Sequence, residues 1–139
     1  MQYGELLHNL FISLQSLYKG KLKHNEASFQ QLIAISILDD DGVEMSKFSQ
    51  KLGIDNSTAT RLIDGIEKKG WVIRKRFSLD NRIIKVFLTD IGRDIYNVTE
   101  SQIEKIGIIV GNETNGDFYE SILESMSNLN WTIEKLKLK

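Results

Sequence analysis

The 139-residue chain contains no cysteine and no proline. Without cysteine it has no disulfide framework, no thiolate metal site and no thiol redox switch. A lack of proline fits a mostly helical chain with few forced breaks. Apolar runs such as residues 32–35 fall far short of the ~20 residues that span a bilayer, and no secretion signal opens the chain. We therefore expect a cytoplasmic protein.

Patterns typical of catalysis are also lacking. The two histidines, His8 and His24, do not have the spacing of a zinc-binding helix. There is no glycine-rich phosphate loop and no Gly-x-Ser-x-Gly motif. The acids at 39–41 are consecutive, whereas calcium loops alternate their ligands, so a solvated turn is favoured there. We predict no catalytic residue, metal or cofactor, and keep an enzyme with an unrecognised site as an alternative.

Residues 46–89 carry the most informative pattern. A short helix is expected to begin at Ser46 and to end at Gly53, and a turn leads to Ser57, which is expected to cap a second helix. Gly70 ends that second helix. Its apolar residues recur at i, i+3, i+4 and i+7. They are Ala59, Leu62, Ile63 and Ile66. This order predicts a helix-turn-helix.

The opposite face of the second helix is polar and includes one guanidinium group. It carries Ser57, Thr58, Thr60, Arg61, Asp64 and Lys68. Such side chains suit a helix that lies in the DNA major groove, where arginine and hydroxyl groups bond base edges. The simpler interpretation is a helix face that is polar only because it meets water.

After Gly70 the pattern changes to a two-residue alternation over 71–76 and again over 84–88, separated by a polar turn at 78–81. This predicts a β-hairpin whose turn presents Asn81 and Arg82, which would suit the minor groove beside a docked helix. Residues 57–88 contain eight Lys or Arg against three acids, so the other residues together carry a net charge of −6. A local basic patch on a mildly acidic chain indicates a phosphate-binding face. We include Arg74 and Arg76 in it.

Four motifs in this order resemble those of the MarR (multiple antibiotic resistance regulator) family of winged-helix transcriptional regulators. They are Ser-Thr-Ala-Thr-Arg at 57–61, Glu-Lys-Lys-Gly-Trp-Val-Ile-Arg at 67–74, Asp-Asn-Arg at 80–82 and Leu-Thr-Asp-Ile-Gly at 88–92. The resemblance implies a homodimer with interlocked helical ends on a near-palindromic operator. It places Ser57, Thr58, Thr60 and Arg61 in the recognition helix and Arg82 on the wing. Phe77 stands where the family often has an acid, so the wing is expected to be braced differently.

Helices are also expected at both ends of the chain, at 2–19 and after 117. Each has a narrow apolar stripe with heptad-like spacing, which suits packing on another helix. The N-terminal stripe is Tyr3, Leu7, Leu10, Leu14 and Leu17, and the C-terminal one is Tyr119, Ile122, Met126, Leu129, Ile133 and Leu136. We predict that both form the dimer interface. Packing on the body of the same monomer is the alternative.

The remaining segments complete one expected domain, 1–139. Ser28 and Gln31 form a capping box for a core helix, and 43–45 is expected to add a third strand. Thr89 is expected to cap a long helix that runs to about Val110. We predict a mainly α fold with a small β-hairpin wing. The winged lobe is 28–90, and 1–22 and 90–139 form the helical dimerisation region.

The predicted function is a homodimeric, sequence-specific, double-stranded DNA-binding transcriptional regulator. We expect a repressor that a small ligand, bound between the helical region and the DNA-reading lobes, releases from its operator. A winged-helix module for protein–protein contacts is the alternative. The predicted DNA contacts are Ser57, Thr58, Thr60, Arg61, Lys68, Arg74, Arg76, Asn81 and Arg82.

Overall fold

A computed structural model describes residues 2–77, 79–114 and 116–139. The chain divides into two compact units, residues 1–103 and residues 104–139. Among the described residues, no helix combines the length and the apolar character needed to cross a membrane.

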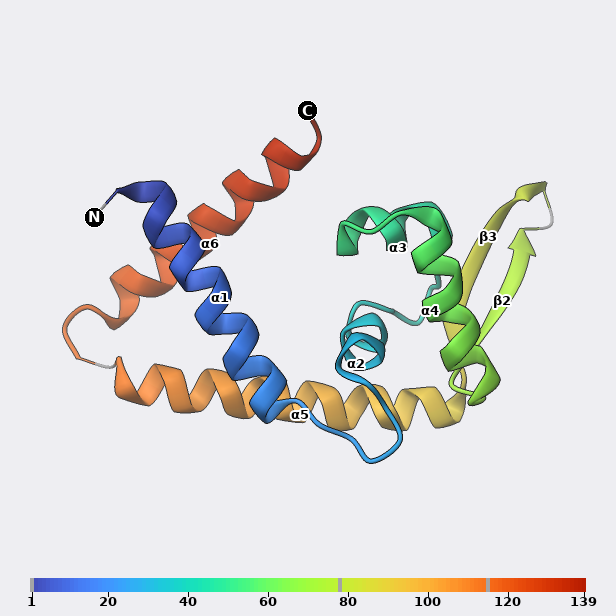
Figure 1. The fold of residues 1–139 in the computed structure, drawn as a ribbon, viewed down its shortest axis with the longest axis horizontal. Coiled ribbons are helices and arrows are strands. Elements are labelled where there is room, and N and C mark those ends of the chain that lie inside the picture. Colours follow the sequence, from blue (N-terminus) through green and yellow to red (C-terminus); the bar gives the residue numbers. More distant parts are fainter. Residues whose placement is uncertain (1, 78, 115) are drawn as a thin grey trace. The chain divides into compact units, whose positions relative to one another are not determined.

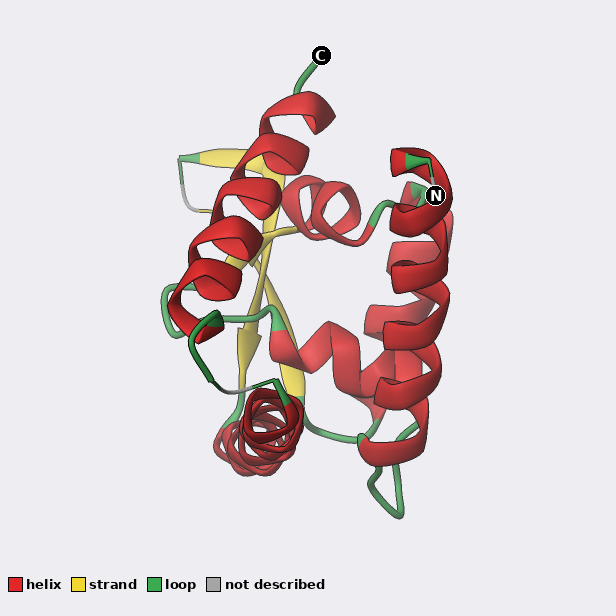
Figure 2. Ribbon diagram, turned by 90° about the vertical axis from the view of Figure 1, so that its left-hand side faces the viewer, coloured by secondary structure: helices red, strands yellow, loops and turns green. Residues whose placement is uncertain are grey.

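The chain is mainly helical, with one small antiparallel sheet (Figures 1 and 2). The sheet has three strands in the order β1-β3-β2. This confirms the predicted fold class. In chain order the elements are α1 (Tyr3–Lys21), α2 (Phe29–Ser36), β1 (Val43–Glu44), α3 (Met45–Leu52), α4 (Asn56–Lys68), β2 (Val72–Phe77), β3 (Asp80–Leu88), α5 (Asp90–Glu113) and α6 (Tyr119–Lys137).

Several helix ends follow the sequence closely. The Ser28 hydroxyl accepts the Gln31 backbone N–H, and the Gln31 side chain accepts the Ser28 backbone N–H, so the predicted capping box is present. Gly53 ends α3 with φ 66° and Gly70 follows α4 with φ 81°, a left-handed conformation that glycine adopts at little cost. The Thr89 hydroxyl accepts the Gly92 backbone N–H at the start of α5.

The predicted starts of the two central helices were wrong by one residue or more. α3 begins at Met45 and its N-cap is Glu44, so Ser46 lies inside the helix. α4 begins at Asn56, because the Asp55 carboxylate accepts the Thr58 backbone N–H at 2.7 Å and caps the helix itself. Asp55 and Ser57 are both good capping residues, and local sequence alone does not choose between them.

The strands also differ slightly from the prediction. β1 is only Val43–Glu44, because Met45 already belongs to α3. β3 begins at Asp80, so the connection between the two long strands is shorter than the turn predicted at 78–81. The helix α5 continues to Glu113, beyond the predicted end at Val110.

The core of the first unit lies between α2, α3, α4 and the sheet. Phe48 of α3, Ile63 and Ile66 of α4, and Val72 and Val86 of the sheet are fully buried there. In Figure 1, α4 runs along the β2–β3 hairpin, and it contacts both α3 and β2. The sheet and the two central helices are therefore one packed body, as a winged helix requires.

The junction between β2 and α5 is tightly packed. Trp71 accepts the Thr89 backbone N–H at 3.0 Å, and the Thr89 hydroxyl donates to the Gly70 carbonyl. A Cβ atom at Gly92 would overlap the Trp71 carbonyl oxygen. The Thr89 and Gly92 positions of the fourth motif thus join the end of the hairpin to the start of α5.

The first and last helices bury no residue within this chain. Many of their large apolar side chains are exposed instead, among them Leu10 and Leu14 of α1 and Met126 and Leu136 of α6. These residues belong to the two predicted stripes, so the interface assignment remains a prediction that the exposure supports.

Candidate nucleic-acid interface

The side of α4 that faces away from the core forms a continuous exposed stripe. Ala59, Ile63 and Ile66 are buried on the other side. Spacings of four, three and four residues place the members of the stripe on one side of a 3.6-residue helix. They are Ser57, Arg61, Asp64 and Lys68, all exposed. We call this stripe the recognition face.

Hydrogen bonds organise the first turn of α4. Asp55 accepts both the Thr58 backbone N–H and the Ser57 hydroxyl, the latter at 2.9 Å. The hydrogen bond from the Thr58 backbone lowers the pKa of Asp55. The Thr60 hydroxyl donates to the Asn56 carbonyl at 2.9 Å. The hydroxyl protons of Ser57 and Thr60 are therefore committed to these bonds, so each oxygen can act toward another partner only as an acceptor.

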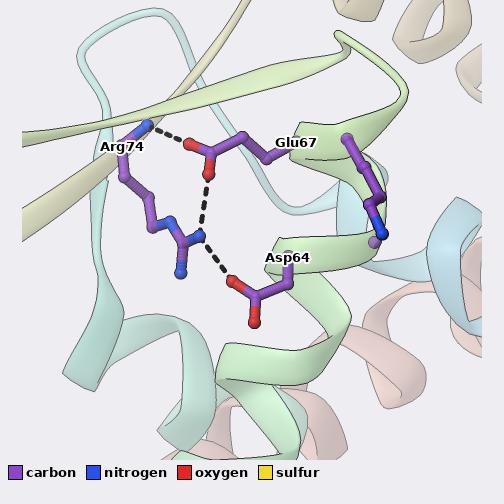
Figure 3. A pocket seen from close by; sticks show the side chains of 5 residues that line it. Asp64, Glu67 and Arg74 are labelled. Atoms are coloured by element: carbon purple, nitrogen blue, oxygen red, sulfur yellow. Dashed lines mark hydrogen bonds and ion pairs between the residues drawn. The ribbon is translucent and has the colours of Figure 1, made fainter.

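Arg74, at the base of the hairpin, bonds two acids of α4 (Figure 3). Its Nη2 atom lies 2.5 Å from Asp64 Oδ1 and 2.7 Å from Glu67 Oε1. Its backbone N–H donates to Glu67 Oε2 at 3.0 Å. The guanidinium hydrogen bond lowers the pKa of Glu67 and raises the pKa of Arg74. These contacts connect α4 directly to strand β2 of the hairpin.

Other basic residues near α4 divide into two groups. Lys69 donates to the Glu26 carbonyl and to Gln31 Oε1, and it lies 4.9 Å from the centre of the Trp71 ring, so it braces the lobe. Arg76 of β2 and Arg82 of β3 are exposed on the hairpin. The side chain of Asn81, another predicted contact, lies outside the described residues.

The structure therefore brings Ser57, Arg61 and Lys68 together on one stripe. It places Thr58 to one side, against an open cavity of about 600 Å³. Sequence reasoning did not identify the bonds that Asp64 and Glu67 make to Arg74. Helical spacing relates the two acids, which are three residues apart, but it says nothing about a strand residue further along the chain.

The cavity beside Thr58 is lined by α1, α2, the α3–α4 turn and α4. Lys19 and Arg61 provide two cations, and none of its lining residues is a carboxylate. Much of the remaining lining is apolar, from Phe29, Ile33, Leu52, Ile54 and Leu62. Its size is within the range of small-molecule sites, and its charge favours an anionic ligand with an apolar body.

Within the described parts of the chain, no three His, Asp or Glu side chains are grouped so that they could hold a metal ion.

Known proteins share this sequence pattern and this fold. Residues 30–84 match the model of the MarR family. The HTH-type transcriptional regulator SarZ of Staphylococcus epidermidis is 31% identical over 99 residues, which are 70% of this chain and 64% of SarZ. The aligned part is thus less than two thirds of that relative.

Two solved structures have the same fold over 96% of this chain and 96% of their own. A MarR transcriptional regulator from Methanosarcina mazei superposes with a TM-score of 0.80 at 23% identity. FabT of Streptococcus pneumoniae, solved in complex with DNA, superposes with a TM-score of 0.74 at 21% identity. The winged lobe, its four motifs and the match of residues 30–84 to the family model therefore agree on a similarity to the MarR family.

Proposed function

We propose that the protein is a sequence-specific, double-stranded DNA-binding transcriptional regulator that represses its target as a homodimer in the cytoplasm. The carrying observation is the exposed recognition face of α4, held beside a hairpin that presents Arg76 and Arg82. A helix of this kind enters the major groove while the wing follows the adjacent backbone or minor groove. No catalytic role is proposed.

The relatives support this proposal. SarZ is a transcriptional regulator, and FabT has been solved with DNA bound. The basic surplus over 57–88, eight Lys or Arg against three acids, supplies the electrostatic attraction to phosphate. Because the rest of the chain is net acidic, that attraction is confined to the winged lobe.

The test is selection of bound sequences from a random duplex pool. We expect one enriched, near-palindromic sequence, and an affinity for it that falls steeply as salt concentration rises. A scrambled duplex of the same composition is the control. If no sequence is enriched and duplex binding is weak at low salt, the protein–protein contact interpretation of the basic patch replaces this proposal.

The homodimer rests on the exposed stripes of α1 and α6. Large apolar side chains such as Leu10, Leu14, Met126 and Leu136 are between 43% and 61% exposed in a single chain. Large apolar side chains exposed along a helix mark an interaction site. In a two-fold dimer the two recognition helices would lie about 34–36 Å apart and read half-sites one helical turn apart.

Release by a small ligand is the second part of the proposal, and the cavity beside Thr58 supports it. A carboxylate placed there would meet Lys19 and Arg61, and its apolar body would meet Phe29 and Leu62. Because Arg61 also belongs to the recognition face, an anion that binds it would oppose DNA binding. The ligand acts only if it binds the DNA-free form more tightly.

A panel of aromatic carboxylic acids tests this second part. We expect at least one acid to raise the melting temperature of the free protein and to weaken operator binding. The matched variant Lys19→Gln removes one cation of the cavity outside the recognition face, so it should lose the ligand response and keep DNA binding. If no acid changes either property, the regulator acts without a ligand of this class.

A further inference from the structure

Asp64 is an unusual residue to find on a surface that meets DNA. It lies on the recognition face one turn after Arg61 and one turn before Lys68, and its side chain is 53% exposed. A carboxylate between two rows of phosphates is repelled by both. A residue of this charge therefore has to be neutralised, or has to make a specific bond, if the helix is to bind.

Arg74 neutralises Asp64 and holds it in place. The guanidinium Nη2 donates to Asp64 Oδ1. The Glu67 carboxylate accepts hydrogen bonds from both the guanidinium and the backbone N–H of the same arginine (Figure 3). The side chain of Arg74 is only 26% exposed, which strengthens these bonds relative to a fully solvated pair. Arg74 thus engages Oδ1 of Asp64, and an ionised carboxylate has a second oxygen that can accept further hydrogen bonds.

We propose that Asp64 is a specificity-determining residue that accepts a hydrogen bond from the 4-amino group of a cytosine in the operator, and that Arg74 and Glu67 are positioning residues for it. This rests on the proposed function, because it assumes that the recognition face lies in a major groove. An ionised carboxylate only accepts hydrogen bonds, so it selects base edges that donate.

Cytosine fits this acceptor better than adenine. Adenine presents its amino group beside the N7 acceptor, which would repel a carboxylate, whereas the cytosine amino group has no acceptor beside it on the same base. Guanine and thymine present only acceptors, with a methyl group on thymine, in the major groove. Arg61, one turn earlier, has the opposite preference, since it donates to guanine. The two residues together would read G and C at nearby positions.

The first experiment compares the bases selected by the wild type, Asp64→Asn and Asp64→Ala from a random duplex pool. We expect one position in each half-site at which the wild type prefers cytosine by about tenfold, and at which both variants lose that preference. Asp94→Asn is the matched control, because Asp94 is an exposed acid of α5 outside the recognition face. It removes the same charge and should select the wild-type sequence.

The second experiment removes the amino group instead of the carboxylate. An operator in which that cytosine is replaced by 2-pyrimidinone, which lacks the 4-amino group, should bind the wild type about tenfold more weakly. Asp64→Ala should bind both operators equally. If the wild type and Asp64→Ala respond alike to the missing amino group, Asp64 does not read it and the proposal fails.

The positioning role has its own readout. Arg74→Gln removes the bonds to both acids, so it should reduce the cytosine preference while the preferences at other positions stay unchanged. If the base preference falls equally at every position, Arg74 has a purely structural role and its assignment as a positioning residue is wrong. If the wild type enriches no duplex at all, the proposed function fails. Enrichment with an unchanged base preference in Asp64→Asn leaves the function standing and rejects only this inference.

Discussion

The helices α4 and α6 are both amphipathic, yet they differ in what their apolar sides contact. α4 buries Ala59, Ile63 and Ile66 in the core of its own chain. None of the 19 residues of α6 is buried, and Met126 and Leu136 are about 60% exposed. The apolar side of α4 is therefore buried within its own polypeptide, whereas the apolar side of α6 is left exposed. The comparison indicates that the proposed DNA binding and the proposed dimer would use surfaces with different partners.

The largest expected effect comes from the exposed stripes. The double variant Leu14→Asp and Leu129→Asp places carboxylates in the proposed interface, so we expect a monomer by sedimentation and a loss of about 100-fold or more in operator affinity, because two linked half-site contacts become one. The melting of the winged lobe should persist. A variant that stays dimeric and binds operator normally would show that the stripes are not the interface.

A smaller effect is expected inside the lobe, at the junction of α5 with Trp71. Gly92→Ala forces a methyl group against the Trp71 carbonyl, and we expect a loss of about 1–3 kcal/mol in the free energy of unfolding. Gly107→Ala in the same helix is the matched control. No atom outside the local helix lies within 4 Å of its added Cβ, so it should stabilise the helix by up to ~1 kcal/mol. Chemical denaturation at equal protein concentration measures both, and equal effects would contradict the close packing.

Variants of Arg61 and Arg82 test whether α4 provides the base-specific contacts and the hairpin provides the contacts that do not depend on sequence. Arg61→Ala should cost about 1–3 kcal/mol on operator and should relax the base preference at one position, because the side chain lies on the recognition face. Arg82→Ala should weaken operator and unrelated A/T-rich duplex together and lower the salt slope by about one unit. Titrations of both variants with operator and with unrelated duplex, at several salt concentrations, distinguish the two effects. An unchanged slope and affinity in Arg82→Ala would mean that the hairpin does not contact DNA.

The smallest effect concerns pH. The guanidinium of Arg74 lowers the pKa of Glu67 in the folded protein, so the ion pair stabilises the fold above the unfolded-state pKa of Glu67. That contribution is lost as pH falls through the lower, folded-state pKa. Because both groups are partly solvated, we expect it to be about 0.5–1 kcal/mol. The difference in melting temperature between wild type and Glu67→Gln should therefore be present at pH 7 and shrink in acid. A constant difference across that range would show that the charge of Glu67 contributes nothing.

Local signals in the sequence determined much of the winged lobe. The capping box of Ser28 and Gln31, the helix ends at Gly53 and Gly70, and the apolar face of α4 each depend on residues within one or two turns of one another. Such features follow from hydrogen-bond geometry and helical periodicity, which act over short separations. The recognition face was predictable for the same reason.

Contacts between elements were decided only by the tertiary structure. The sequence placed Arg74 on the hairpin but could not show that α4 supplies the acids that bind it. It included Lys69 in the basic patch, although the folded lobe directs that amine to the Glu26 carbonyl. The sequence also predicted Ser57 as the cap of α4, whereas Asp55 caps the helix in the structure. Each outcome depends on which distant groups the packed core brings within a few ångströms, and periodicity along one helix carries no information about that.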